Sequence, residues 1–191
     1  MNSRRSLWTA KLRGQKTIAK GRAIAQQTVF SGCILGIDPS LRGSGFSVIE
    51  IKPDASMHYL ESLTLKLGQK KSFVECLGEI FKATDAFFEK YAIKAVGIEQ
   101  TIYVQNSKTA HILGSARGAC LSAVALRNVP VQEFAPLRIK KSVTGVGQAT
   151  KEQVAKMVQQ LLNLPKTLPP DESDATAAAL CYFFSLKSLI V

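Results

Sequence analysis

The chain has 191 residues, of which 46% are apolar, and its formal net charge is +11. This length and composition fit one domain that buries about 70% of the surface of the unfolded chain, so no second core is required. The longest apolar runs, such as 175–184, are far shorter than the roughly 20 residues that cross a bilayer, and the N-terminus lacks the apolar core of a secretory signal. We therefore expect a soluble protein with no membrane partner.

The positive charge is concentrated at the N-terminus. Residues 1–30 contain seven Lys or Arg and no Asp or Glu, whereas residues 31–191 contain 18 basic and 14 acidic residues. We expect a flexible basic arm over residues 1–30 and a single domain over residues 31–191. The arm is open to three interpretations: an electrostatic handle for nucleic acid, a transit-peptide-like leader, or a weakly structured extension with no special role.

The four cysteines stand singly along the sequence. Cys33, Cys76, Cys120 and Cys181 lie in apolar or helical surroundings, without the C-x-x-C spacing of a zinc or redox site. We interpret them as reduced thiols in or near the core, which favours a reducing compartment.

The hydrophobic pattern predicts nine elements in the order βββαβαβαα. Three short strands come first and suggest an antiparallel meander, because turns join them directly. Helices and strands then alternate, and Thr150 is in position to cap the penultimate helix. The strands are expected at 33–37, 45–51, 58–67, 93–98 and 129–134, and the helices at 73–91, 107–126, 151–162 and 172–186. This order predicts an α/β domain with a mixed sheet and helices on its faces.

Carboxylates follow these elements at three places. Asp38 ends the first strand, Glu99 ends the fourth, and Asp171 and Asp174 lie three residues apart at the start of the last helix, on one of its faces. Each could act alone as a turn former or helix cap. If the four converge, pairs about 5 Å apart repel by roughly 3 kcal/mol each, so a cation or shared protons must compensate. Oxygen ligands without His or Cys suit Mg²⁺ or Mn²⁺.

Six blocks of sequence resemble one known family. They are "ILGIDPS", "AVGIEQ", "LGSARGA", "PVQEFAP", "KKSVTGVGQATKEQV" and "DESDATAAAL", in this order between residues 33 and 186. They are similar to RuvC-type Holliday-junction resolvases, which have the ribonuclease H-like fold. The resemblance implies a five-stranded mixed sheet, with three antiparallel strands followed by two parallel ones, flanked by helices.

The resemblance also implies an activity and a site. RuvC-type enzymes are homodimers that nick two strands of a four-way DNA junction symmetrically during recombination and repair, and they use divalent metal. By position, Asp38, Glu99, Asp171 and Asp174 match the catalytic acids, which would hold two Mg²⁺ ions (or Mn²⁺) per site. Relatives work with a branch-migration motor of the RuvA and RuvB kind. A bacterial cytoplasmic location is expected, with organellar import of a eukaryotic protein as the alternative that the basic arm leaves open.

Basic residues are placed to bring DNA to these acids. Residues 100–150 contain six Lys or Arg and one acid, Glu133, and Arg117 is one of the candidates to contact DNA in this stretch. Lys140 and Lys151 match family positions that contact the DNA backbone, Lys141 is adjacent, and the "TGVG" turn offers backbone amides to a phosphate.

Three departures from the family pattern carry expectations of their own. Ser40 replaces a common glycine. Ile102 stands where relatives often have an aromatic that stacks on a junction base, and Tyr103, one residue later, is the candidate replacement. Glu172 is an extra acid, about 100° around the helix from Asp171, and we expect it to face solvent.

The helix at 107–126 is apolar or small over more of its surface than one sheet contact needs, and Gly114 and Gly118 permit close helix approach. From the residues alone it is either a central core helix or a dimer helix, and the resemblance favours the dimer. Two other classes remain for the whole chain. One is a DNA-binding protein of this fold without nuclease activity, and the other is an actin-like phosphotransferase, which needs two such lobes where this chain has residues for one.

Overall fold

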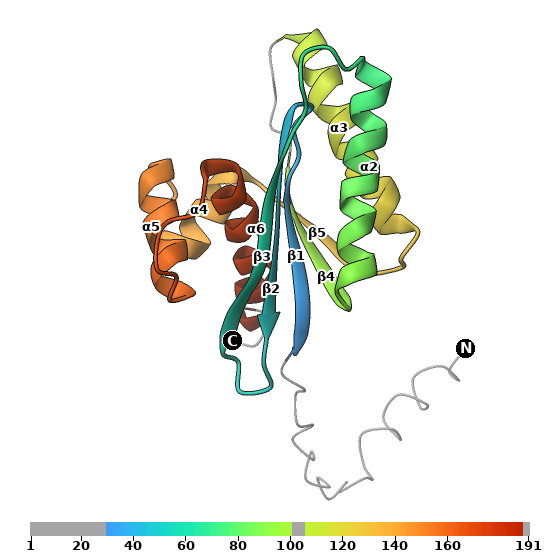
Figure 1. Ribbon diagram of the computed structural model, residues 1–191. Coiled ribbons are helices and arrows are strands. Elements are labelled where there is room, and N and C mark those ends of the chain that lie inside the picture. Colours follow the sequence, from blue (N-terminus) through green and yellow to red (C-terminus); the bar gives the residue numbers. More distant parts are fainter. Residues whose placement is uncertain (1–29, 101–105, 189–191) are drawn as a thin grey trace, which may run out of the picture.

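The computed structural model describes residues 30–100 and 106–188 (Figure 1). Five strands and five helices are present in this part of the chain. They are β1 (Gly32–Asp38), β2 (Gly43–Ile51), β3 (Met57–Lys66), α2 (Phe73–Lys90), β4 (Ile93–Glu99), α3 (Ser107–Ala125), β5 (Val131–Phe134), α4 (Pro136–Thr144), α5 (Lys151–Leu161) and α6 (Pro170–Ser188). Residues 1–29 of the predicted arm (1–30) lie outside the described residues. Its last residue, Phe30, packs against Tyr182, with ring centroids 6.3 Å apart.

The sheet has the predicted mixed topology. Its strand order is β3-β2-β1-β4-β5; β1, β2 and β3 pair antiparallel, whereas β4 pairs parallel with both β1 and β5. The two strands with the most regular apolar sequence, β1 and β4, lie in the middle of the sheet. Helices on both faces cover them, which is where continuous apolar runs are expected.

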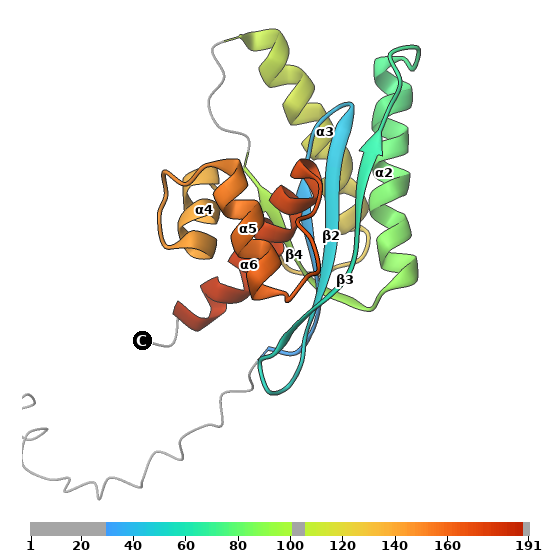
Figure 2. The same cartoon turned by 60° about the vertical axis from the view of Figure 1, so that its left-hand side comes forward.

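Helices cover both faces of the sheet and form two cores. Figures 1 and 2 show α2 and α3 on one face and α4, α5 and α6 on the other. Successive residues of a strand point to opposite faces, so Leu35 and Ile37 pack with α2 and α3, while Ile34 packs with the α6 side. No helix in the described part of the chain is both long and apolar enough to span a membrane.

The predicted cap at Thr150 is confirmed, since Thr150 and Gln153 form a reciprocal capping box at the start of α5. Ser72 and Glu75 form a second capping box at the start of α2, which was not predicted. The four cysteines are unpaired, as predicted; Cys33 is half-buried and the others are buried.

The helix α4 was not predicted. Its nine residues begin with Pro136 in the first turn and end at Gly145, which has a φ of 79°. Proline at the start and glycine just past the end are the signals that could have identified it. Ile139 and Val143 of this helix are buried against the core.

Candidate active site

The helix α6 lies directly on the sheet because glycines remove the side chains beneath it. A Cβ atom on Gly36 would lie 1.9 Å from the carbonyl oxygen of Ala175, and a Cβ on Gly97 would lie 2.4 Å from that of Ala178. Gly36 and Gly97 are partners across β1 and β4. Only glycine allows so close an approach of helix backbone to strand, so these two positions fix α6 over the middle of the sheet.

Asp38 and Glu99 end two neighbouring strands on the face that α6 covers. Ile37 and Ile98 are partners across β1 and β4, so the residues that follow them, Asp38 and Glu99, end the two strands side by side. Gly36 faces α6, and Asp38, two residues further along the same strand, shares that face. Both carboxylates are half-buried.

The first turn of α6 meets the same corner of the sheet. A Cβ atom on Gly45 would lie 2.0 Å from the carbonyl oxygen of Asp171, and Gly45 is the antiparallel partner of Asp38. Asp174 is one turn further along α6. The structure therefore brings the four predicted acids to one corner of the sheet.

The electrostatics of this corner reflect crowded negative charge. Burial, followed by the charges of Glu99, Asp174 and Asp171, raises the pKa of Asp38 from its ordinary value of 3.8 to about 7. Burial and the charge of Asp174 also raise the pKa of Glu99. A buried carboxylate that faces other carboxylates is costly to ionise, so the site has a deficit of positive charge.

Two lysines on α4 and α5 supply part of the missing charge. Lys151 Nζ donates a hydrogen bond of 2.6 Å to Asp174 Oδ2, and this bond, with weaker contributions from Asp38 and Glu99, raises the pKa of Lys151. Lys140 is close enough to oppose the rise in the pKa of Glu99. Within residues 30–100 and 106–188, no three His, Cys, Asp or Glu side chains are arranged to hold one metal ion, and the partner of Asp174 is Lys151.

The other predicted DNA contacts are placed differently. Lys141 is exposed. Arg117, on α3, forms an ion pair with Glu133 of β5, and its Nε is buried without a hydrogen-bond partner among the described residues. Tyr103 and Ile102 lie outside the described residues, so the predicted role of Tyr103 stays a prediction.

The "TGVG" turn after α4 does not offer all its amides to a phosphate. The Gly145 N–H donates to the Lys141 carbonyl oxygen at 2.9 Å, and the Val146 N–H donates to Thr144 Oγ1 at 3.1 Å. The prediction was wrong for these two amides, because the turn uses them to end α4.

Glu172 was predicted to face solvent, and this prediction was wrong. Its carboxylate accepts hydrogen bonds from the hydroxyls of Ser62 and Thr64 on β3, the second at 3.2 Å, and the side chain is half-buried. A helical wheel gives the angle between Glu172 and Asp171, but not the fact that the sheet continues beneath the helix on that side.

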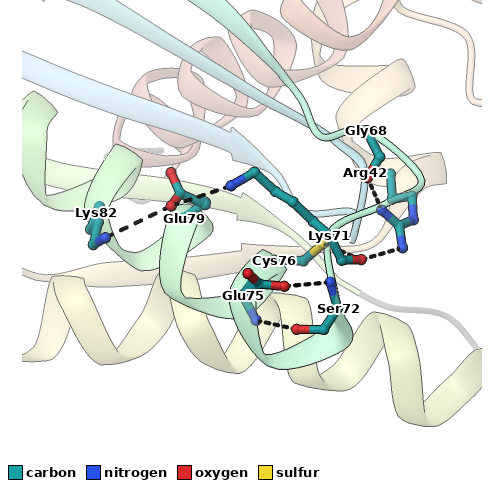
Figure 3. A network of polar contacts seen from close by, with 8 residues as sticks. All are labelled: Arg42, Gly68, Lys71, Ser72, Glu75, Cys76, Glu79 and Lys82. Carbon is teal, nitrogen blue, oxygen red and sulfur yellow. Dashed lines mark hydrogen bonds and ion pairs between the residues drawn. The ribbon is translucent and has the colours of Figure 1, made fainter.

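The loop after Asp38 is held by an arginine that the sequence analysis missed. Arg42 Nη1 donates to the Gly68 carbonyl oxygen at 2.5 Å and Nη2 to that of Lys71 at 3.0 Å (Figure 3). Within the loop, Ser40 Oγ accepts from the Gly43 N–H at 3.0 Å. The serine that replaces a family glycine therefore closes the turn.

The same network joins the loop to α2. In Figure 3, Glu79 lies between Lys71 and Lys82, each at 3.7 Å, beside the capping box of Ser72 and Glu75. The loop that follows Asp38 is thus anchored to the start of a helix on the opposite face of the sheet.

Comparison with known proteins agrees with this arrangement. The family model described as "Crossover junction endodeoxyribonuclease RuvC" matches residues 34–182. A protein of that name from Hyphomonas neptunium is 42% identical over 148 residues, which cover 78% of this chain and 88% of the relative. Another, from Methylobacillus flagellatus, is 40% identical over 154 residues, covering 78% and 85%.

A solved structure is similar over most of the chain. "T. thermophilus RuvC in complex with Holliday junction substrate" superposes with a TM-score of 0.74 at 25% identity, over 82% of this chain and 96% of that one. Sequence and structure therefore agree on the ribonuclease H-like fold, and the chain belongs to the RuvC family of crossover junction endodeoxyribonucleases.

Proposed function

We propose that the protein is a Mg²⁺-dependent endonuclease that resolves four-way DNA junctions during recombination and repair, with Asp38, Glu99, Asp171 and Asp174 as its catalytic acids. The observation that carries the proposal is the meeting of three separate elements, each with an acid, at one corner of the sheet. The relatives are named for cleavage of crossover junctions, and the Thermus structure holds a junction substrate.

The donors fit a hard divalent cation. All four are carboxylates, and the pKa of Asp38, raised to about 7 by burial and by its acidic neighbours, marks a site that lacks positive charge. The four acids would hold two Mg²⁺ ions, with Mn²⁺ as the alternative, because oxygen ligands suit both. When bound, such ions activate a water and stabilise the leaving oxygen in phosphodiester hydrolysis.

The protein's own residues would position the scissile phosphate. Lys151 and Lys140 border the acids on the α4 and α5 side. A DNA phosphate placed there can therefore replace Asp174 as the hydrogen-bond partner of Lys151. Lys141, Arg117 and Tyr103 are proposed to contact DNA further out. For Arg117, this requires exchange of its Glu133 partner.

We also propose a homodimer formed through α3. This helix packs on its own subunit through Ala116, Cys120, Ala123 and Val124. Cβ atoms on Gly114 and Gly118 would meet no described atom within 4 Å other than those of their chain neighbours and of the adjacent backbone of α3 itself. A dimer presents two sites to one junction, which is how paired nicks arise. A branch-migration motor of the RuvA and RuvB kind is the proposed further partner.

The proposal is tested with a mobile four-way junction and a linear duplex of the same sequence, each incubated with the protein and Mg²⁺. We expect paired, symmetric nicks in the junction only, and none in EDTA. Asp38→Asn should abolish nicking and leave junction binding intact. Equal cutting of both substrates would contradict junction resolution, and loss of binding in Asp38→Asn would mean that this residue serves the fold.

A further inference from the structure

The carboxylate of Glu172 connects the first turn of α6 to strand β3. It accepts hydrogen bonds from Thr64 Oγ1 at 3.2 Å and from Ser62 Oγ. Ser62 Oγ lies in turn 2.7 Å from the hydroxyl of Tyr59. Each carboxylate oxygen of Glu172 therefore has a hydroxyl donor on β3.

The backbone of Glu172 is held as well. Thr176 Oγ1 donates to the Glu172 carbonyl oxygen at 2.6 Å and lies 2.7 Å from Ser47 Oγ of β2, in a fully buried position. The first turn of α6 is thus tied to β2 through Thr176 and to β3 through Glu172.

The bond to Thr64 lies in the same row of the sheet as Asp38, and those to Ser62 and Ser47 lie in the row of Gly36, two residues away. Thr64 pairs with Gly45, and Gly45 pairs with Asp38, so one row across β3, β2 and β1 runs from the hydroxyl to the catalytic carboxylate. Asp171 lies directly above Gly45. A shift of Glu172 relative to Thr64 would therefore move Asp171 relative to Asp38.

We propose that Glu172 is a positioning residue: with Ser62 and Thr64, it fixes the helical turn that carries Asp171 and Asp174 against the sheet. It acts through hydrogen bonds, not as an additional ligand. Both of its carboxylate oxygens are engaged on β3, and the strand β2 separates β3 from Asp38 on β1. Groups that orient the ligands of a metal commonly change metal affinity or activity by about 10–100-fold when they are removed.

Two substitutions separate hydrogen bonding from charge. Glu172→Gln removes the charge but keeps the bridge, since the amide can accept from one hydroxyl and donate to the other oxygen. Glu172→Ala removes the bridge. The pair Ser62→Ala with Thr64→Val removes the hydroxyls from the other side without any change of charge. Glu50→Ala is the control, because it removes an acid that pairs with Lys52 at the opposite end of β2 from Gly45.

The first measurement uses metal-free protein and does not depend on the proposed function. Hydrogen exchange of the peptide 170–176 should be faster in Glu172→Ala and in the Ser62, Thr64 double variant, and unchanged in Glu172→Gln and Glu50→Ala. Unchanged exchange in Glu172→Ala would overturn the proposal.

The second measurement is junction cleavage as a function of Mg²⁺, and it rests on the proposed function. For Glu172→Ala we expect the Mg²⁺ concentration at half-maximal rate to rise about tenfold, with unaltered junction affinity in EDTA and near-wild-type values for Glu172→Gln. The double variant should match Glu172→Ala, and combining all three substitutions should add nothing further.

The outcomes keep the two proposals apart. If Glu172→Gln is as impaired as Glu172→Ala, the charge of Glu172 is what matters and the positioning role is refuted. A lower unfolding temperature without a change in Mg²⁺ dependence would show a purely structural bond and also refute it. If the wild type does not nick junctions at all, the proposed function fails, and the hydrogen exchange result alone decides the role of Glu172.

Discussion

Replacing Asp38, one of the four proposed catalytic acids, should stabilise the metal-free protein. In the structure, burial and three neighbouring carboxylates raise the pKa of Asp38 to about 7, whereas its ordinary value is 3.8. This difference corresponds to about 4 kcal/mol of destabilisation once the carboxylate is ionised. Asp38→Asn removes that cost but buries an amide with imperfect partners, which costs about 1–3 kcal/mol. The net expectation at about pH 8 is a gain of about 1–3 kcal/mol, or several degrees in Tm.

The gain must depend on pH with a definite sign. A carboxyl group whose pKa is higher in the folded than in the unfolded state is neutral in both below about pH 4, so it costs nothing there. As pH rises from about 4 to about 7, only the unfolded state ionises freely, and folding stability is lost; above about 7 the loss is constant. The advantage of Asp38→Asn should therefore be full above about pH 7 and disappear on acidification.

The assay is reversible urea unfolding in EDTA, followed by circular dichroism between about pH 5 and about pH 8. Asp54→Asn is the matched control. Asp54 is exposed, and hydrogen bonds from the Ser56 side chain and from the Ser56 N–H, the latter at 2.9 Å, lower its pKa. Its loss should therefore bring no gain at any pH. If Asp38→Asn is no more stable than the wild type at about pH 8, or if its advantage does not shrink in acid, ionised Asp38 is not destabilised by burial and by its acidic neighbours as the structure implies.

Two further predictions concern glycines. Gly118→Leu should leave the subunit folded, because its Cβ meets open space, but should shift the proposed dimer to the 20.7 kDa monomer by size exclusion with light scattering. Gly78→Leu, on α2 and equally open, is its control; a dimer that survives Gly118→Leu would exclude this part of α3 from the interface. Gly97→Ala should destabilise by about 3 kcal/mol or more, because its Cβ would lie 2.4 Å from the carbonyl oxygen of Ala178. Gly68→Ala, with nothing within 4 Å, should have little effect in the same urea assay, and a mild Gly97→Ala would mean that α6 is not held so close to the sheet.

Much of the architecture could be predicted because the sequence pattern is local. Alternating and continuous apolar runs predicted all five strands, the helical spacing of apolar residues predicted α2, and the cap residue Thr150 predicted the start of α5. The acids at the ends of β1 and β4 also follow from the pattern, since parallel neighbouring strands end at the same edge of a sheet. The sequence pattern does not show on which side of a helix the sheet continues. For this reason the prediction that Glu172 faces solvent was wrong.

A signal for the close approach of α6 was present but not used. Gly36, Gly45 and Gly97 interrupt strands that otherwise favour branched and aromatic residues. Glycine inside a strand often marks a place where another backbone comes close. Together with the alanine-rich last helix, these positions indicate both the helix that crosses the sheet and where it crosses.

The close packing of α6 on the sheet offsets the electrostatic repulsion at the site. Ala175, Ala177, Ala178 and Ala179 are fully buried, but each contributes little apolar surface. The helix is therefore held by shape complementarity with the glycines and by hydrogen bonds such as that of Thr176, while its first turn carries acids whose charge is repelled by that of Asp38. A turn under such repulsion would be the part of α6 most ready to lift from the sheet without metal. The bonds from Glu172 to β3 lie at that turn, where they oppose this displacement without placing another charge among the acids.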